Sequence, residues 1–116
     1  MIGLPAGTRI WIAAGVPDLR RGFIGLSGMV QTALQENPLS GHVFIFHNRT
    51  ADRLKVLYWG GHGLCLWCQR LEQGRYHFPT PPADCTSMEL SAGQFQMILD
   101  GIDVTRVKRF KRFTPQ

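Results

Sequence analysis

The strongest chemical signal in this sequence is a run of five cations within seven positions near the C-terminus: Arg106, Lys108, Arg109, Lys111 and Arg112. Apolar residues interleave with them, including Phe110 and Phe113. Cations bind nucleic-acid phosphates without regard to sequence, and aromatic rings stack on exposed bases. We therefore predict that these five cations, together with Phe110, bind nucleic acid or an acidic partner surface. The alternative is a solvated tail that only aids solubility.

The excess positive charge of the chain is confined to this run. The 116 residues include 13 lysines and arginines and eight aspartates and glutamates, so the net charge of the chain is +5. The five cations of the C-terminal run account for the whole excess, so the rest of the chain is formally neutral. Like charges repel and disfavour folding of such a segment by itself. We predict one compact domain over residues 1–103 and a basic flexible arm over residues 104–116.

A second candidate site is the stretch Asp18-Leu19-Arg20-Arg21-Gly22, where a helix is expected to begin. Two arginines in a first helical turn oppose the helix dipole, so local helix propensity does not explain them. Free backbone N–H groups and arginines together can hold an anion, and we name Arg20 and Arg21 as candidate nucleic-acid ligands. The alternative is an ion pair of one arginine with Asp18 or Glu72.

The third candidate is Cys65-Leu66-Trp67-Cys68, which has the two-residue spacing of many zinc and redox sites. His62, His77 and Cys85 are near in sequence but lack the regular spacing of a second ligand pair. Free cysteines in apolar surroundings are usually buried. We therefore predict that both are reduced, that at least one is buried, and that no metal or other cofactor is bound. A small zinc-binding or redox module using Cys65 and Cys68 is the alternative function.

Signatures of catalysis are missing from the sequence. It contains no glycine-rich phosphate loop ending in Lys-Ser/Thr and no Gly-x-Ser-x-Gly nucleophile elbow. Its eight carboxylates are scattered, whereas two-metal phosphoryl-transfer sites need a cluster of them. We therefore predict a protein that is not an enzyme.

The elements that must position these residues follow from hydrophobic periodicity. Alternating or continuous short apolar runs predict strands over residues 9–13, 42–46, 54–59 and 76–78, and the second and third should pair antiparallel. Helical spacing predicts a long helix over residues 19–35, with Asp18 as its N-cap, and short helices near 64–71 and 95–99, the last preceded by the capping-box spacing of Ser91 and Gln94. Residues 48–52 have the composition of a turn, and residues 80–87 are predicted as a loop. The fold class is therefore α+β, a small, mainly antiparallel sheet packed by one long and two short helices. A strand over residues 64–71, forming a hairpin, is the main alternative.

Three glycines, Gly22, Gly25 and Gly28, recur inside the predicted long helix. Each costs roughly 1 kcal/mol relative to alanine in an exposed helix interior. We interpret them as permitting close packing of the helix against the sheet. Close approach of a nucleic-acid or partner backbone is the alternative.

Several motifs together resemble the small second-open-reading-frame (TnpB-type) proteins of the insertion sequence 66 family of bacterial transposable elements. The central motifs are Leu54-Lys55-Val56-Leu57-Tyr58-Trp59, Gly63-Leu64-Cys65-Leu66-Trp67 and Gln69-Arg70-Leu71-Glu72-Gln73-Gly74-Arg75-Tyr76. Flanking matches are Asp18-Leu19-Arg20-Arg21-Gly22-Phe23, Pro38-Leu39-Ser40-Gly41-His42-Val43-Phe44-Ile45-Phe46 and Gly101-Ile102-Asp103. The chain departs from the family pattern at Gly60, where an Asp is usual, and at Gln69, where a Lys is usual.

The resemblance implies a non-catalytic accessory protein required for DNA transposition, with the transposase, sister proteins of the same element and element DNA as partners. The sequence shows no long apolar span and no signal peptide, and its three cysteines form no disulfide framework. We therefore expect a bacterial cytoplasmic protein that associates with the nucleoid when it acts.

Overall fold

The computed structural model of the protein describes residues 6–15 and 19–104. In chain order, its elements are β1 (Ile10–Ala13), α1 (Phe23–Thr32), β2 (Val43–His47), β3 (Arg53–Trp59), β4 (Leu64–Arg70), β5 (Ser87–Leu90) and α2 (Ala92–Leu99). Neither helix is long and apolar enough, within the described ranges, to cross a membrane.

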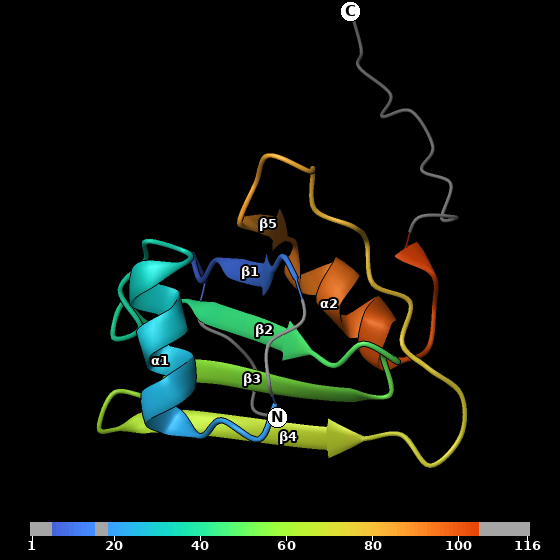
Figure 1. Ribbon diagram of the computed structural model, residues 1–116, viewed down its shortest axis with the longest axis horizontal. Coiled ribbons are helices and arrows are strands. Elements are labelled where there is room, and N and C mark those ends of the chain that lie inside the picture. The colour runs from blue at the N-terminus through green and yellow to red at the C-terminus, as the bar shows by residue number, and fades with distance from the viewer. Residues whose placement is uncertain (1–5, 16–18, 105–116) are drawn as a thin grey trace, which may run out of the picture.

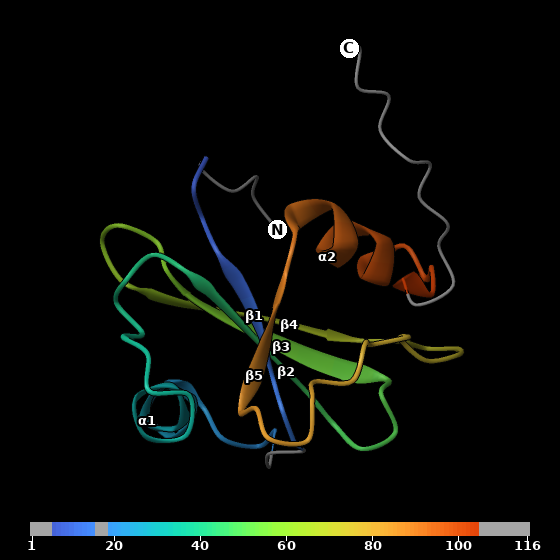
Figure 2. The same ribbon diagram turned by 90° about the horizontal axis from the view of Figure 1, so that it is seen from above.

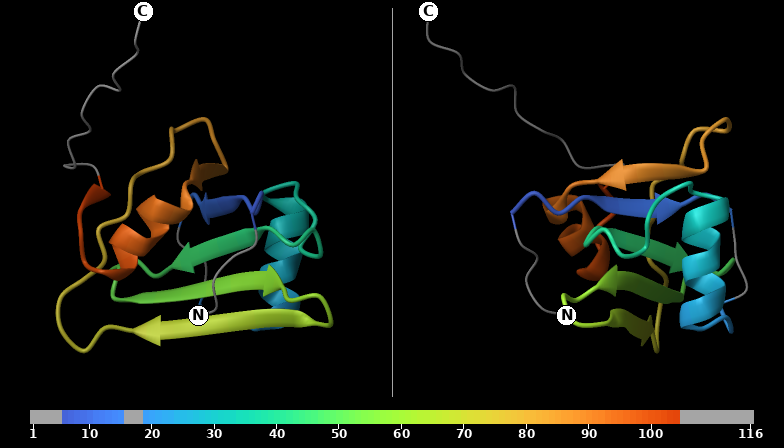
Figure 3. Two further views of the ribbon diagram at one scale, coloured as in Figure 1. Left: turned by 180° about the vertical axis from the view of Figure 1, so that it is seen from behind. Right: turned by 90° about the vertical axis from the view of Figure 1, so that its left-hand side faces the viewer.

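The five strands form one mixed sheet in the order β4-β3-β2-β1-β5 (Figure 1). β1 and β2 are parallel, and the other three neighbouring pairs are antiparallel. Figure 3 shows β4 and β5 at the two edges of the sheet. The chain therefore folds as two consecutive hairpin connections, β2–β3–β4, and then brings β5 back to β1.

The two helices lie on opposite faces of the sheet (Figure 2). Successive side chains of a strand alternate between faces, so each strand supplies both layers of core. The α1 face buries Ala13, Leu26, Val30, Leu34, Phe44, Phe46 and Leu57. The α2 face buries Ile10, Ile12, Val43, Ile45, Leu54, Val56, Tyr76, Leu90, Phe95 and Ile98. Because both faces are covered in the centre, β2 is an almost continuous apolar run.

The predicted fold class, α+β with one long and two short helices, is wrong. The described chain has a mainly-sheet fold with a five-stranded mixed sheet and two short helices. The principal error is the helix predicted near residues 64–71, which is the strand β4. Seven consecutive residues of β4 pair with β3, from Trp59↔Leu64 to Arg53↔Arg70. The alternative hairpin is therefore the correct interpretation of this segment.

The long helix predicted over residues 19–35 is also shorter than expected. α1 begins after Gly22, whose backbone is extended, and it ends at Thr32. Asp18, the predicted N-cap, lies outside the described residues. The packing explanation of the glycines is wrong as well: no atom of the described residues would meet a Cβ at Gly22 or Gly28, and one at Gly25 would lie 2.9 Å from Cβ of Arg21 rather than against the sheet.

Near the C-terminal end of the fold, the strand predicted over residues 76–78 does not form, and the structure has a strand, β5, that was not predicted. Residues 76–78 form no strand, although Tyr76 is buried and Phe78 stacks on His47 with ring centroids 4.3 Å apart. β5 pairs with β1, although it begins in a stretch predicted as loop. The hairpin of β2 and β3 and the helix α2, with its Ser91–Gln94 capping box, are confirmed.

Candidate anion-binding site

A hollow of about 700 Å³ lies on the α1 face of the sheet, over the start of β3 and the end of β4. α1 crosses the opposite end of these two strands and leaves this end uncovered (Figure 1). The lining residues, which define the basic hollow, are Leu19, Arg20, Asn48, Arg53, Leu54, Lys55, Cys68, Gln69 and Arg70. Four of them are cations, and within the described ranges no carboxylate lines the hollow. The hollow is therefore a concentration of positive charge on a part of the chain that is neutral as a whole.

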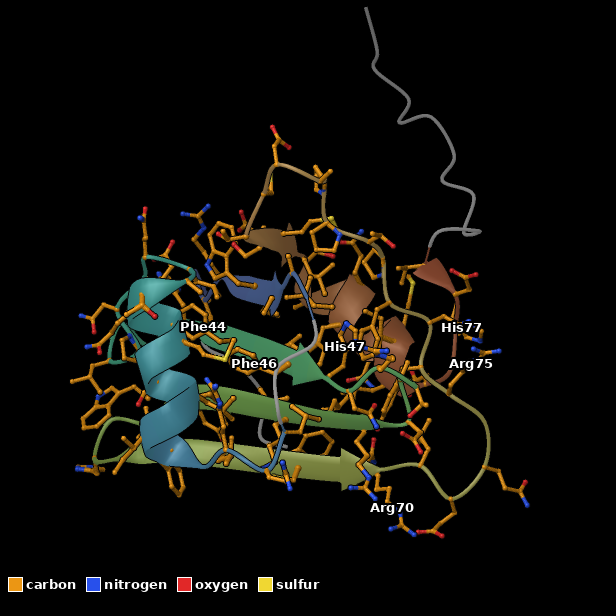
Figure 4. All side chains as sticks on the ribbon, in the orientation of Figure 1. Phe44, Phe46, His47, Arg70, Arg75 and His77 are labelled. Carbon is orange, nitrogen blue, oxygen red and sulfur yellow. The ribbon has the colours of Figure 1, made fainter. Side chains whose placement is uncertain are left out.

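Strand periodicity explains why three of these cations share one face. Leu54 and Val56 pack into the α2-side core, so the alternate residues Arg53 and Lys55 face the α1 side. The antiparallel register places Arg70 opposite Arg53 and Cys68 opposite Lys55. Figure 4 shows Arg70 at the end of β4. Like charges directly opposite one another destabilise a sheet, so the Arg53–Arg70 pair is not explained by sheet stability.

The two arginines predicted at the helix start have different surroundings. Arg20 lines the basic hollow, on the segment that leads into α1. The side chain of Arg21 lies over Gly25, and its backbone oxygen accepts a hydrogen bond of 3.1 Å from Nζ of Lys55. The structure therefore brings Arg20 together with Arg53, Lys55 and Arg70, whereas Arg21 serves to hold Lys55 against the start of α1.

The turn between β2 and β3 fixes the other side of the basic hollow. Asn48 Oδ1 accepts hydrogen bonds of 3.1 Å from the backbone N–H groups of both Asp52 and Arg53. Asn48 Nδ2 donates to Asp52 Oδ1 at 2.6 Å. The segment after β4 is tied to the same turn, because Leu71 N–H donates to Asp52 O at 2.7 Å and Tyr76 N–H to Ala51 O at 2.6 Å. This network holds the start of β3, which carries Arg53, next to the end of β4, which carries Arg70.

Asp52 is the titratable group at the centre of this turn. Hydrogen bonds from Asn48, and then from Thr50 Oγ1 at 2.8 Å, lower the pKa of Asp52 below its ordinary value. Burial opposes these two hydrogen bonds with a smaller effect than either, and the positive charge of Arg53 makes a still smaller contribution that lowers the pKa. Asp52 therefore stays ionised to lower pH than a free aspartate, and its charge is committed to the turn.

Replacing Asp52 by asparagine should flatten the acid side of the stability profile. A lowered folded-state pKa contributes stability that is complete above the unfolded pKa, about 3.9, and is lost as pH falls through the folded pKa. In urea unfolding from about pH 6 to about pH 2.5, wild type should therefore lose stability more steeply than Asp52→Asn. Glu89→Gln is a positive control: the pKa of Glu89 is also lowered, by its hydrogen bond with Arg9, so this variant should flatten the profile as well. Parallel curves for wild type and Asp52→Asn would contradict the role of the turn.

The cysteine prediction is wrong in one respect. Cys65 is half-buried and Cys68 is exposed, so neither belongs to the core. Cys65, opposite Tyr58, and Cys68, opposite Lys55, are three residues apart on one strand and face opposite sides of the sheet. Within the described ranges, no three His, Cys, Asp or Glu side chains are grouped so that they could hold a metal ion. The strand geometry therefore removes the two-residue spacing as an argument for a zinc or redox site.

The remaining predicted ligands, Arg106, Lys108, Arg109, Phe110, Lys111 and Arg112, lie outside the described residues. Sequence reasoning missed three cations of the basic hollow: Arg53, Lys55 and Arg70. The alternation Arg53-x-Lys55 on a predicted strand could have identified the first two. Arg70 was not placed with them, since residues 64–71 were predicted as a helix and only the alternative hairpin would bring this segment beside the strand of Arg53.

Comparison with known proteins places this geometry in context. A family model described as IS66 Orf2 like protein matches residues 8–109. The uncharacterized protein y4jC of Sinorhizobium fredii is 39% identical over 109 residues, which cover 94% of this chain and 92% of the relative. The uncharacterized protein y4hO of the same organism is 41% identical over 102 residues, which cover 86% and 87%. No solved structure matches the chain significantly.

Proposed function

Because this chain belongs to the IS66 Orf2-like family of insertion-sequence proteins, we propose that it is a non-catalytic accessory protein required for transposition of its element. In this role it binds the DNA of the element and other proteins that the element encodes, the transposase among them. It acts in the bacterial cytoplasm, at the nucleoid.

The observation that carries the DNA contact is the basic hollow. Four cations line it and, among the residues that the structure describes, no carboxylate does, although the chain up to Thr105 has no net charge. Phosphate contacts supply most of the non-specific affinity of DNA-binding proteins. The proposed nucleic-acid ligands are therefore those of the hollow together with Arg21 and the predicted arm residues, Arg106, Lys108, Arg109, Phe110, Lys111 and Arg112.

A transposition assay tests the accessory role. A marked copy of the element that lacks this gene should transpose far less often than the intact element, and the wild-type chain supplied in trans should restore the frequency. The purified chain, incubated with element ends and Mg²⁺, should leave the DNA uncut. An unchanged frequency without the gene would refute the accessory role, and cleavage of the ends would make the chain an enzyme.

A pull-down of the other proteins of the element, with and without nuclease treatment, addresses the partners. Capture that survives nuclease treatment supports direct protein contact. Capture that is lost supports a bridge of DNA.

A further inference from the structure

We propose that the basic hollow is a phosphate-binding site for a nucleic-acid backbone, in which Arg53 and Arg70 hold one phosphodiester group between them. The choice of ligand rests on the proposed function. The site itself rests on the geometry of β3, β4 and the segment before α1.

Arg53 and Arg70 lie opposite one another on the neighbouring strands β3 and β4. The bond from Leu71 N–H to Asp52 O marks the neighbouring residue pair as a hydrogen-bonded pair of the ladder. Arg53↔Arg70 is therefore a non-hydrogen-bonded pair, whose Cα atoms come within about 4.5 Å and whose side chains lie closest. Both side chains are exposed and on the α1 face. An anion between the two guanidinium groups would relieve their mutual repulsion, and their fork geometry matches the oxygens of a phosphate.

Two further cations of the lining, Lys55 and Arg20, add positive charge beside the arginine pair. Lys55 lies two residues along the same face, with its Nζ held at 3.1 Å from Arg21 O, a bond that takes one of its three N–H donors. Arg20 completes the lining from the other side. Among the described residues, the carboxylates nearest along the chain, Asp52 and Glu72, are not in the lining, and Asp18 lies outside the described residues. The described lining therefore adds two further cations and no carboxylate beside the arginine pair.

The residue types that line the basic hollow favour a phosphodiester over an acidic protein segment as its occupant. Specific protein–protein interfaces depend on apolar or aromatic anchors that enter pockets. The apolar leucines of the lining are Leu19, which is half-buried, and Leu54, which is only 1% exposed, so they leave little surface for an anchor to contact. Three of the four cations are arginines, the residue best suited to planar, bidentate phosphate contacts.

The test compares two full-length double variants that lose the same charge. Arg53→Gln with Arg70→Gln removes the arginine pair. Arg49→Gln with Arg75→Gln is the matched control, because these two residues line a separate, smaller hollow at the same end of the sheet. Binding of a short DNA duplex is followed by fluorescence anisotropy at several salt concentrations.

For the first variant, the slope of log K against log salt should become less negative by about 0.9, because the two arginines hold one phosphate between them and that one contact is lost. Affinity near 0.1 M salt should fall at least about tenfold. In the control variant, the salt slope and the DNA affinity should each change by less than half as much as in the first variant. The melting temperature of the control should stay the same, and that of the first variant should stay the same or rise, since the like-charge pair is gone. Equal losses in both variants would show a diffuse field instead of a site, and an unchanged slope would refute the site.

Cys68 gives a second readout within the hollow itself, because it is exposed and lies opposite Lys55. Bound duplex should slow its alkylation by iodoacetamide several-fold, measured by mass spectrometry, and should leave exposed Cys85, which does not line the hollow, unaffected. Unchanged reactivity of Cys68 under saturating DNA would overturn the proposal. Equal protection by a polyglutamate peptide, with displacement of the duplex, would also overturn it and identify an acidic protein segment as the occupant.

These outcomes separate the site from the function. If the Arg53→Gln, Arg70→Gln variant binds DNA like wild type and supports transposition, the site is refuted and the accessory role stands. If the gene is dispensable for transposition while the variant loses DNA affinity, the site stands and the role is refuted.

Discussion

A chain that lacks residues 106–116 should lose most of the salt-dependent part of its DNA affinity. If all five arm cations reach phosphates, the slope of log K against log salt on duplex DNA changes by roughly 4 to 5 on deletion. When the salt concentration rises from about 50 to about 200 mM, the full-length chain should therefore lose roughly 250 to 1000 times more DNA affinity than the truncated chain. This effect exceeds the one expected for the basic hollow, which should account for the salt dependence that remains.

The measurement is the same anisotropy titration, combined with thermal unfolding. A full-length chain with the five arm cations replaced by glutamine is the matched control, since it keeps Phe110 and separates charge from aromatic stacking. The sequence predicts an arm outside the packed domain, so the melting temperature should be nearly unchanged. Equal affinity of the full-length and truncated chains would refute the role of the arm, and a large loss of stability would show that its apolar residues pack into the core. Undiminished transposase capture by the truncated chain would instead locate the partner surface on residues 1–105.

The largest effect on stability is expected for Phe44→Ala. Phe44 is fully buried beneath α1, opposite Leu57 on β3 and beside Trp11 on β1 (Figure 4). Removing a buried phenylalanine ring costs about 3 to 5 kcal/mol, because transfer energy is lost and a cavity remains. That is a large share of the roughly 5 to 15 kcal/mol that stabilises a typical domain.

Urea unfolding followed by tryptophan fluorescence measures this cost. Phe23→Ala is the matched control, because the same ring is removed at a position that is 48% exposed at the start of α1. The control should change the free energy of unfolding by well under half as much. If both variants lost the same free energy, Phe44 would not be a core residue. In cells, Phe44→Ala should reduce transposition through lower abundance of the folded chain, whereas Arg53→Gln with Arg70→Gln should reduce it at normal abundance.

Local signals in the sequence were sufficient for several elements. Ser91 and Gln94 predicted the start of α2, because a capping box is closed by residues three positions apart. The apolar runs of β2 and β3, with a turn of suitable composition between them, predicted their antiparallel pairing. The argument that arginines at a helix start can hold an anion named Arg20 as a candidate ligand; the structure places Arg20 in the basic hollow, and its role as a ligand stays a prediction.

The basic hollow as a whole depended on information that no local pattern contains. Leu64, Trp67, Cys68 and Leu71 fit a helical period, yet residues 64–68 are also a continuous apolar run that a buried strand would have, and a short apolar run cannot distinguish the two. Pairing with β3 decides the matter, because it satisfies the backbone groups of β4 and buries side chains of both strands. Only as a strand does this segment bring Arg70 opposite Arg53.

The sequence by itself determined the family of this protein, the β2–β3 hairpin, α2 and the confinement of the charge excess to residues 106–112. The tertiary structure alone decided that β4 is a strand, that β5 pairs with β1 about 75 positions away along the chain, and that α1 stops short of the end of the sheet that carries Arg53 and Arg70. The physical reason is that capping, turns and hairpins are made by near neighbours. The identity of an edge strand and the assembly of a charged hollow depend on hydrogen bonds and burial between segments that meet only in the folded chain.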